Sequence, residues 1–450
     1  MVAPDNSIQR PLRFWEQVCS FMGVSMGFEL DGKISPEMIK QAYALLQKEY
    51  PYLRCVLTQD NNLLSFVEKT PTPACELKVH TDSLPDFRKT MIDLGNTMRD
   101  HTKSIAYLEL FSKGEKHILV STINHAGLDA LNAFQIYNSL LTYIGLLSAG
   151  KALPEPKPNS FADVLGSIPA AYKKADRLEV PAKFMAQIGA DPSAKGSDKG
   201  HVEALFTELP KDVTAALIKK SHDKGVTIQG AISAASAVAT AACQAKEFPL
   251  PQTMLLQCPA SVRKQVEPPV TAAQGGQGAS LLWWVQDVKS SDTLWTVAKE
   301  ATTNVKRENA AKGGLAFWAR MYADKTMFEA MSQETPSFNP PFTTTASSIG
   351  INSIQSAYGP IKVPRAHIML ATYGVTSPTE AGHMTHAHTF NDQLNITFTY
   401  SMPAVGDARG KKINATQIAV LKALATGNES ATVADFLTIT PDASADLISL

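Results

Sequence analysis

The stretch Ser121-Thr-Ile-Asn-His125-Ala-Gly-Leu-Asp129-Ala130 places a histidine directly after a predicted strand and an aspartate four positions later, at the start of a predicted helix. Residues 105–123 contain two runs of strand-forming residues around a short polar turn, which predicts a hairpin. Residues 130–148 carry apolar side chains at helical spacing, and a glycine follows as a stop signal. Because ligand sites of α/β proteins lie at the carboxyl ends of strands, His125 is the first candidate for a functional residue.

The rest of the chain predicts two α/β regions joined by a connector. Ser35 and Pro36 are typical of a helix start, and that helix ends near Tyr50. Prolines and other breakers gather between residues 151 and 200, which we interpret as a connector carrying one or two helices. We therefore expect an N-terminal lobe over residues 1–165, a linker over 166–200 and a C-terminal lobe over 201–450. The second region is predicted to contain helices at 211–224, 227–246, 293–309, 316–331 and 415–426, and strands at 253–258, 280–286, 343–350, 366–374, 384–390 and 394–400.

Composition excludes several classes of function. The 450 residues are 44% hydrophobic, and 42 basic residues balance 42 acidic ones, so no net field favours nucleic acid or an anionic membrane. The five cysteines are scattered and form no C-x-x-C pair, which argues against a disulfide framework and against a zinc site. No apolar run is long enough to span a bilayer. We expect a cytoplasmic monomer that acts on small molecules, with no metal and no bound cofactor.

A histidine with a near-neutral pKa can accept the proton of an attacking hydroxyl or amine and return it to a leaving thiolate. The same H-x-x-x-D spacing occurs again at His388 and Asp392. There the histidine lies in a strand that runs into an Asn-Asp turn, which indicates a hairpin and needs no catalytic explanation. From the spacing alone, His125 could also be a histidine held by hydrogen bonds in the core, beside an ordinary aspartate at a helix start.

The flanking residues add a family resemblance that spans the whole chain. Several segments, in the expected order, resemble those of the condensation-domain and chloramphenicol-acetyltransferase-like superfamily. This superfamily includes the BAHD acyltransferases and the free-standing alcohol or polyketide-associated acyltransferases. The segments that carry the resemblance are Glu49-Tyr-Pro-Tyr-Leu-Arg54, Asn124-His125-Ala-Gly-Leu-Asp129, Gly225-Val-Thr-Ile-Gln-Gly-Ala-Ile-Ser, Cys258-Pro-Ala-Ser-Val-Arg263, Ser347-Ser-Ile-Gly350 and Thr389-Phe-Asn-Asp-Gln-Leu-Asn.

The resemblance implies a fold and a set of site residues. We expect an α/β protein of two chloramphenicol-acetyltransferase-like lobes, arranged as a V-shaped pseudo-dimer with a central tunnel. His125 would be the catalytic general base. Asp129, paired with Arg54, and Gly127 would have structural roles in the motif, although Arg263 is a second possible partner for the aspartate. The oxyanion candidates are Ser347, Ser348 and the backbone around Gly127, and the substrate-tunnel candidates are Trp284, Tyr373, His386 and Arg263.

The implied activity is transfer of an acyl group from a thioester, with acyl-CoA as co-substrate, to a hydroxyl or amine of a small molecule. Asn124 stands where condensation domains have a first histidine, Ala130 stands where they have a glycine, and no D-F-G-W-G of a standard BAHD enzyme occurs. A free-standing acyltransferase is therefore the preferred hypothesis. A condensation-type enzyme that takes its thioester from an acyl carrier protein, and a non-catalytic relative that only binds a ligand or protein, remain alternatives.

Three other patterns carry less weight. Gly23-Val-Ser25-Met-Gly27 fits the G-x-S-x-G of hydrolases, but the residues around it predict a strand, so we expect a structural role. His383, His386 and His388 lack a neighbouring carboxylate or thiolate cluster, which favours a solvated or ligand-channel face over a metal site. Residues 274–278 lack the G-K-[ST] of a phosphate loop, and we interpret them as a flexible or lobe-crossing segment that could border the tunnel.

Overall fold

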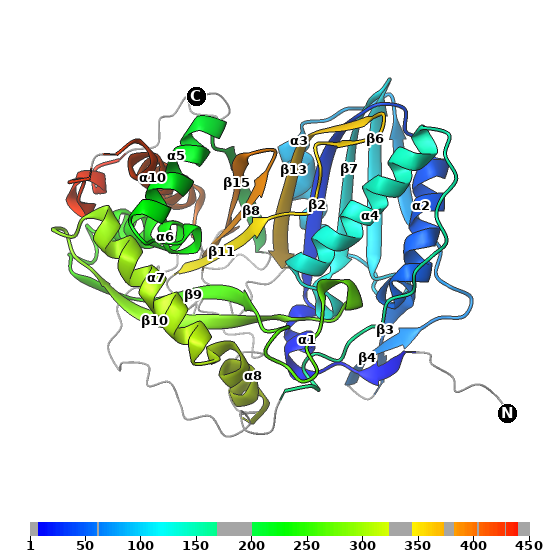
Figure 1. Ribbon diagram of the computed structural model, residues 1–450, viewed down its shortest axis with the longest axis horizontal. Helices are drawn as coiled ribbons and strands as arrows, with labels where there is room; N and C mark the ends of the chain where they lie inside the picture. The colour runs from blue at the N-terminus through cyan, green and yellow to red at the C-terminus, as the bar shows by residue number, and fades with distance from the viewer. Residues whose placement is uncertain are drawn as a thin grey trace. The chain divides into compact units, whose positions relative to one another are not determined.

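The computed structural model describes residues 8–60, 63–168, 200–323, 344–372, 382–402, 405–427 and 429–439. The chain divides into two compact units, and neither is continuous in sequence. Unit 1 comprises Met1–Pro169, Arg263–Ala279 and Asn352–Tyr373, and unit 2 comprises Ala170–Val262, Ser280–Ile351 and Gly374–Leu450. Each unit contains one six-stranded sheet, so the architecture is mixed α/β (Figure 1).

The sheet of unit 1 has the strand order β12-β13-β2-β7-β6-β5. Its central strand β2 pairs antiparallel with β13 and with β7, and β6 and β7 form the predicted hairpin. Helices α2 and α4 pack against each other on one side of the sheet (Figure 1). A small antiparallel sheet, β1-β4-β3, completes the unit. The bounds are β1 Gln9–Pro11, α1 Phe14–Cys19, β2 Met22–Asp31, α2 Pro36–Glu49, η1 Pro51–Arg54, β3 Cys55–Asp60, β4 Leu63–Glu68, β5 Glu76–Thr81, α3 Phe87–Gly95, β6 Ala106–Lys113, β7 Lys116–Asn124, η2 His125–Gly127, α4 Ala130–Ser148, η5 Ala272–Gln274, β12 Ala357–Tyr358 and β13 Ile361–Thr372.

The sheet of unit 2 has the order β10-β9-β11-β14-β15-β8, with β11 parallel to both β9 and β14. Helix α6 is nearly wholly buried in the core, where its alanines allow α7 and α10 to approach closely. The bounds are β8 His201–Glu208, α5 Lys211–Asp223, α6 Ile228–Gln244, β9 Gln252–Ser261, β10 Ala279–Val288, α7 Leu294–Ala310, α8 Gly313–Ala323, β11 Thr344–Ile351, β14 His383–Phe390, β15 Gln393–Met402, α10 Asp407–Thr426 and η6 Val433–Phe436.

The predicted lobe boundaries differ from the structure in two segments. Residues 263–279 and 352–373 were expected in the C-terminal lobe, but both belong to unit 1. The second segment contains β13, whose residues pair with β2 along most of its length. Hydrogen bonding between segments far apart in sequence decides such membership, and local sequence patterns do not carry that information. Most of the predicted linker lies outside the described residues.

Most predicted elements are confirmed within a few residues at their ends. Ser35 accepts a hydrogen bond from the Met38 amide as the predicted N-cap of α2. At the tip of the β14–β15 hairpin, Asn391 and Asp392 have φ values of 50° and 62°, as the Asn-Asp turn predicts. Among the described helices, none is by itself long and apolar enough to cross a membrane, and only α5 and α6 taken together, at an angle of 103°, satisfy length and composition.

Candidate active site

His125 begins the short helix η2, directly after β7. Its Nδ1 lies 2.7 Å from the Leu128 carbonyl oxygen, which can only accept, so Nδ1 carries the proton and Nε2 keeps its lone pair. Burial lowers the pKa of His125, although the Leu128 carbonyl and the Asp129 carboxylate oppose that effect. A neutral imidazole of this tautomer can act as a general base through Nε2.

The loop around His125 is held by Tyr52, from η1. The Tyr52 hydroxyl donates to the Asn124 carbonyl at 2.8 Å and accepts from the Gly127 amide at 3.2 Å. A Cβ on Gly127 would lie 2.0 Å from the Tyr52 ring, so only glycine permits this close approach. The ring itself stacks on Phe161, with 5.2 Å between centroids. Tyr52 therefore fixes the backbone on both sides of His125.

Asn124 supports the same loop from within. It is fully buried, its Oδ1 accepts from the Ala126 amide at 3.0 Å, and its Nδ2 donates to the Ser20 carbonyl at 2.8 Å. At the position of the first histidine in the condensation-domain motif, this chain thus has a structural side chain. The amides of Ala126 and Gly127 both donate to side chains, so neither of these two is available to an oxyanion in this conformation.

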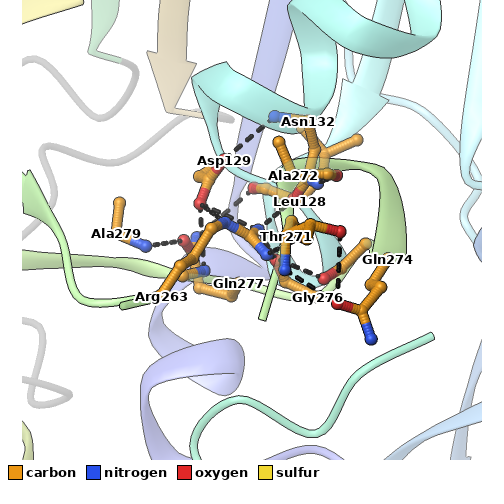
Figure 2. A network of polar contacts seen from close by, with 12 residues as sticks. Leu128, Asp129, Asn132, Arg263, Thr271, Ala272, Gln274, Gly276, Gln277 and Ala279 are labelled. Atoms are coloured by element: carbon orange, nitrogen blue, oxygen red, sulfur yellow. Dashed lines mark hydrogen bonds and ion pairs between the residues drawn. The ribbon is translucent and has the colours of Figure 1, made fainter. Parts of the chain in front are cut away.

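Asp129 is the N-cap of α4 and pairs with Arg263 (Figure 2). Its Oδ1 accepts from the Asn132 amide at 3.0 Å, and its Oδ2 accepts from Arg263 Nε at 3.0 Å and from the Gly278 amide at 3.1 Å. Both charged side chains are 3% exposed. The remaining guanidinium nitrogens donate to the carbonyls of Thr271, Gly275 and Gly276 and to the Asn132 side chain.

Two predictions about the arginines are corrected. Arg54 does not pair with Asp129, because its Nε lies 2.6 Å from Glu68 and a second nitrogen donates to the Gln47 carbonyl. Arg263 does not line a tunnel, since protein acceptors occupy its buried guanidinium. The sequence offered both arginines as partners of the aspartate, and only the path of the segment 263–279 across unit 1 selects between them.

That segment also brings Gln277 to His125. Gln277 is 1% exposed, and its Nε2 lies 3.1 Å from the His125 carbonyl oxygen and 3.5 Å from His125 Nδ1. Gly276 donates its amide to the Gly127 carbonyl at 3.1 Å. The predicted lobe-crossing segment is thus a packed part of the site in unit 1.

The oxyanion candidates Ser347 and Ser348 lie in β11 of unit 2. Ser347 is opposite His386 of β14 in the strand register. Ala346 and Ala387 face the helix-covered core, so alternation along the strands directs Ser347, His386 and His388 to the other face of the sheet. The Ser348 amide donates to the Gln229 side chain at 2.7 Å.

Three other residues singled out in the sequence have different outcomes. Trp284 was expected in a tunnel, but it is 1% exposed within the core cluster of unit 2 and donates to Gln286 at 3.0 Å. Its neighbour Trp283 instead contacts Phe317 edge-on. Tyr373 lies outside the described residues. Ser25 lies inside β2, fully buried and 2.9 Å from the Thr122 hydroxyl, as a structural role requires.

The three histidines of β14 do not share one face. His383 points toward α6, where its Nε2 lies 3.1 Å from Thr240 Oγ1, and burial lowers its pKa to about 3. His386 and His388 alternate to the opposite face. Within the part of the chain that the structure describes, no group of three or more histidine, cysteine, aspartate or glutamate residues could hold a metal ion.

Sequence reasoning missed Tyr52, Asn132 and Gln277, which surround the His125 motif in unit 1, and Gln229, which contacts β11 in unit 2. Tyr52 and Gln229 lie inside segments that carried the family resemblance, and Gln277 lies in the segment interpreted as lobe-crossing. Uncharged polar side chains have no distinctive spacing, so their roles depend on partners that only the fold supplies.

Comparisons with known proteins bear on the fold and on one segment of the chain. Residues 199–336 match the family described as the phthiocerol/phthiodiolone dimycocerosyl transferase C-terminus. No curated protein sequence matches the chain significantly.

Solved structures with the same fold include polyketide synthase associated protein 5 from Mycobacterium tuberculosis, at 15% identity and a TM-score of 0.66, over 92% of this chain and 98% of that one. Trichothecene 15-O-acetyltransferase from Fusarium sporotrichioides superposes with a TM-score of 0.69 at 11% identity, over 94% and 96% of the two chains. The condensation domain of the Monacolin K polyketide synthase superposes with a TM-score of 0.67 at 15% identity, over 95% of this chain and 100% of that domain. The chain therefore has the fold that these acyltransferases and condensation domains share, and its residues 199–336 resemble the C-terminal part of a dimycocerosyl transferase.

Proposed function

We propose that the chain is an acyltransferase that moves an acyl group from a thioester, acyl-CoA in the first instance, to a hydroxyl of a small molecule. The observation that carries the proposal is the 2.7 Å contact between His125 Nδ1 and the Leu128 carbonyl, because it leaves Nε2 as the basic nitrogen. The lowered pKa of His125 keeps this nitrogen unprotonated near neutral pH.

The proposed reaction uses His125 twice. Nε2 takes the proton of the acceptor hydroxyl while its oxygen attacks the thioester carbonyl carbon, which forms a tetrahedral oxyanion. When the oxyanion collapses, the C–S bond breaks and the protonated His125 returns the proton to the departing sulfur. The products are an ester and a free thiol, with no acyl-enzyme. Ser347 remains the proposed oxyanion donor, and the tunnel between two lobes remains part of the proposal through the family resemblance.

The donor can also be a thioester on an acyl carrier protein. The likeness to condensation domains supports this second candidate, since one of those domains comes from a polyketide synthase and another from the CDA synthetase. An amine acceptor, which would yield an amide, is consistent with the same proton transfers. Donor preference separates the two candidates, because a carrier-dependent enzyme would be inactive with free acyl-CoA.

The test is release of free thiol from short and long acyl-CoA donors, with mixed alcohols and amines as acceptors. We compare wild type with His125→Ala and with His222→Ala, a histidine whose side chain is 91% exposed on unit 2. Wild type and His222→Ala should release thiol only when an acceptor is present, and His125→Ala should release none. Turnover by a folded His125→Ala protein would remove the proposed mechanism.

A further inference from the structure

In the sheet of unit 2, the hydrogen-bonded pairing between the parallel strands β9 and β11 ends close to Ser347. Strands β9 and β11 pair at Leu256↔Thr344 and Gln257↔Thr345, and there the pairing ends. Both strands continue, β9 to Ser261 and β11 to Ile351. Extending the register by two residues places Pro259 opposite Ser347.

In a parallel ladder, the residue opposite Ser347 would donate its amide to the Ala346 carbonyl and accept from the Ser348 amide. Pro259 has no amide hydrogen, so it cannot make the first of these bonds. The side chain of Gln229 makes both instead: its Nε2 donates to the Ala346 carbonyl at 2.9 Å, and its Oε1 accepts from the Ser348 amide at 2.7 Å. One primary amide thus takes the place of a peptide unit of β9.

Gln229 is held in this position from its own helix. It lies in the first turn of α6, and its Nε2 also donates to Ser233 Oγ at 2.9 Å, one turn further along. Beyond the Gln229 contact, β11 departs from regular pairing with β14 as well, with a register shift between Ser348 and Gly350. Two features therefore determine the backbone position around Ser347. The Gln229 amide bonds to the β11 edge that faces β9, and the register shift lies on the edge that pairs with β14.

The geometry points to Gln229 as a positioning residue that holds β9 and β11 apart and so presents the Ser347 hydroxyl to the reacting thioester. This role rests on the proposed function, in which Ser347 stabilises the oxyanion. The carboxyl ends of parallel strands that part from each other are typical places for a ligand in α/β proteins. Closing the gap by continuing the ladder would move Ser347 and remove that opening.

Two variants separate the positioning role from a merely structural one. Gln229→Leu removes both bonds and should lower the melting temperature and reduce kcat at least about tenfold, with a smaller change in KM, because the lost contact acts on the transition state. Adding Pro259→Val restores a backbone amide opposite Ser347. The double variant should then regain melting temperature by completing the ladder, while kcat stays low because the strands have closed.

The matched control is Gln252→Ala. Gln252 is 1% exposed and donates to the carbonyls of Ala241 and Phe248, away from β11, so this variant should lose stability and keep kcat. In Gln229→Glu, the ionised carboxylate can accept from Ser348 but cannot donate to Ala346, and kcat should again fall.

Recovery of kcat together with melting temperature in the double variant would overturn the positioning role, as would an unchanged kcat in Gln229→Leu. A wild type that transfers no acyl group from any thioester would overturn the proposed function instead. The melting temperatures of the single and double variants would still decide whether Gln229 stands in for the amide missing at Pro259, because that readout needs no substrate.

Discussion

The Asp129 carboxylate and the Arg263 guanidinium lie 3.0 Å apart, although 134 residues separate them along the chain. The pair joins the start of α4 to the segment 263–279 (Figure 2). The same segment carries Gln277 to the backbone of His125. Since both charges are almost wholly buried, each is tolerated only because the other is present.

Breaking this pair should destabilise the protein strongly. Asp129→Ala leaves a buried guanidinium without its anion, and we expect the free energy of unfolding to fall by about 3–5 kcal/mol. Urea denaturation measures the change. Arg54→Met is the control, because the Arg54–Glu68 pair is partly exposed and should contribute only about 1 kcal/mol or less. Equal losses in the two variants would contradict the assignment of Arg263 as the structural partner.

The Tyr52 hydroxyl should contribute both to the stability of the protein and to kcat. Tyr52→Phe keeps the stacking on Phe161 but removes the bonds to the Asn124 carbonyl and the Gly127 amide, so we expect a loss of about 1–3 kcal/mol in stability. Because these bonds fix the backbone beside His125, kcat should fall as well. Tyr50→Phe, which removes a hydroxyl that lies 3.3 Å from Ser139 Oγ, serves as the comparison in both measurements. A Tyr52→Phe enzyme with full kcat would show that the loop holds without this hydroxyl.

The pH dependence of acyl transfer should report the lowered pKa of His125. Because the neutral imidazole is the active form, kcat/KM should rise with pH to a plateau, with a midpoint below the ordinary histidine value of about 6.5. Initial rates of thiol release from roughly pH 4.5 to roughly pH 8, the range around a histidine's titration, give the profile. A midpoint clearly above about 6.5 would mean that another group limits the rate.

His383 should make stability depend on pH. Its folded pKa of about 3 lies below the value in the unfolded chain, so the unfolded state binds the proton more tightly. The stability that neutral His383 provides is present above pH of about 6.5 and is lost as the pH falls from there toward about 3. Melting temperatures over this range should fall less steeply in His383→Gln than in wild type. Parallel curves for the two proteins would assign the acid sensitivity to other groups.

The order of the elements, and the position of His125 between a strand and a helix start, follow from local features of the sequence. Helices such as Pro36–Glu49 and Ala130–Ser148 follow from capping residues and apolar spacing, and the turn at Asn391 and Asp392 follows from the φ values those residues tolerate. His125 was identifiable because it stands between a strand and a helix start, within a short local motif. All of these are local properties of the chain.

The partners that lie far apart in sequence depend on the fold of each unit. Arg263, and not Arg54, became the partner of Asp129, Trp284 packed in the core, β13 joined the first sheet, and the Gln229 side chain bonded to the backbone of β11. Many side chains carry hydrogen-bonding groups, and these groups need partners when they are buried. Which partner each group meets depends on the path of the whole chain, so local sequence cannot predict it.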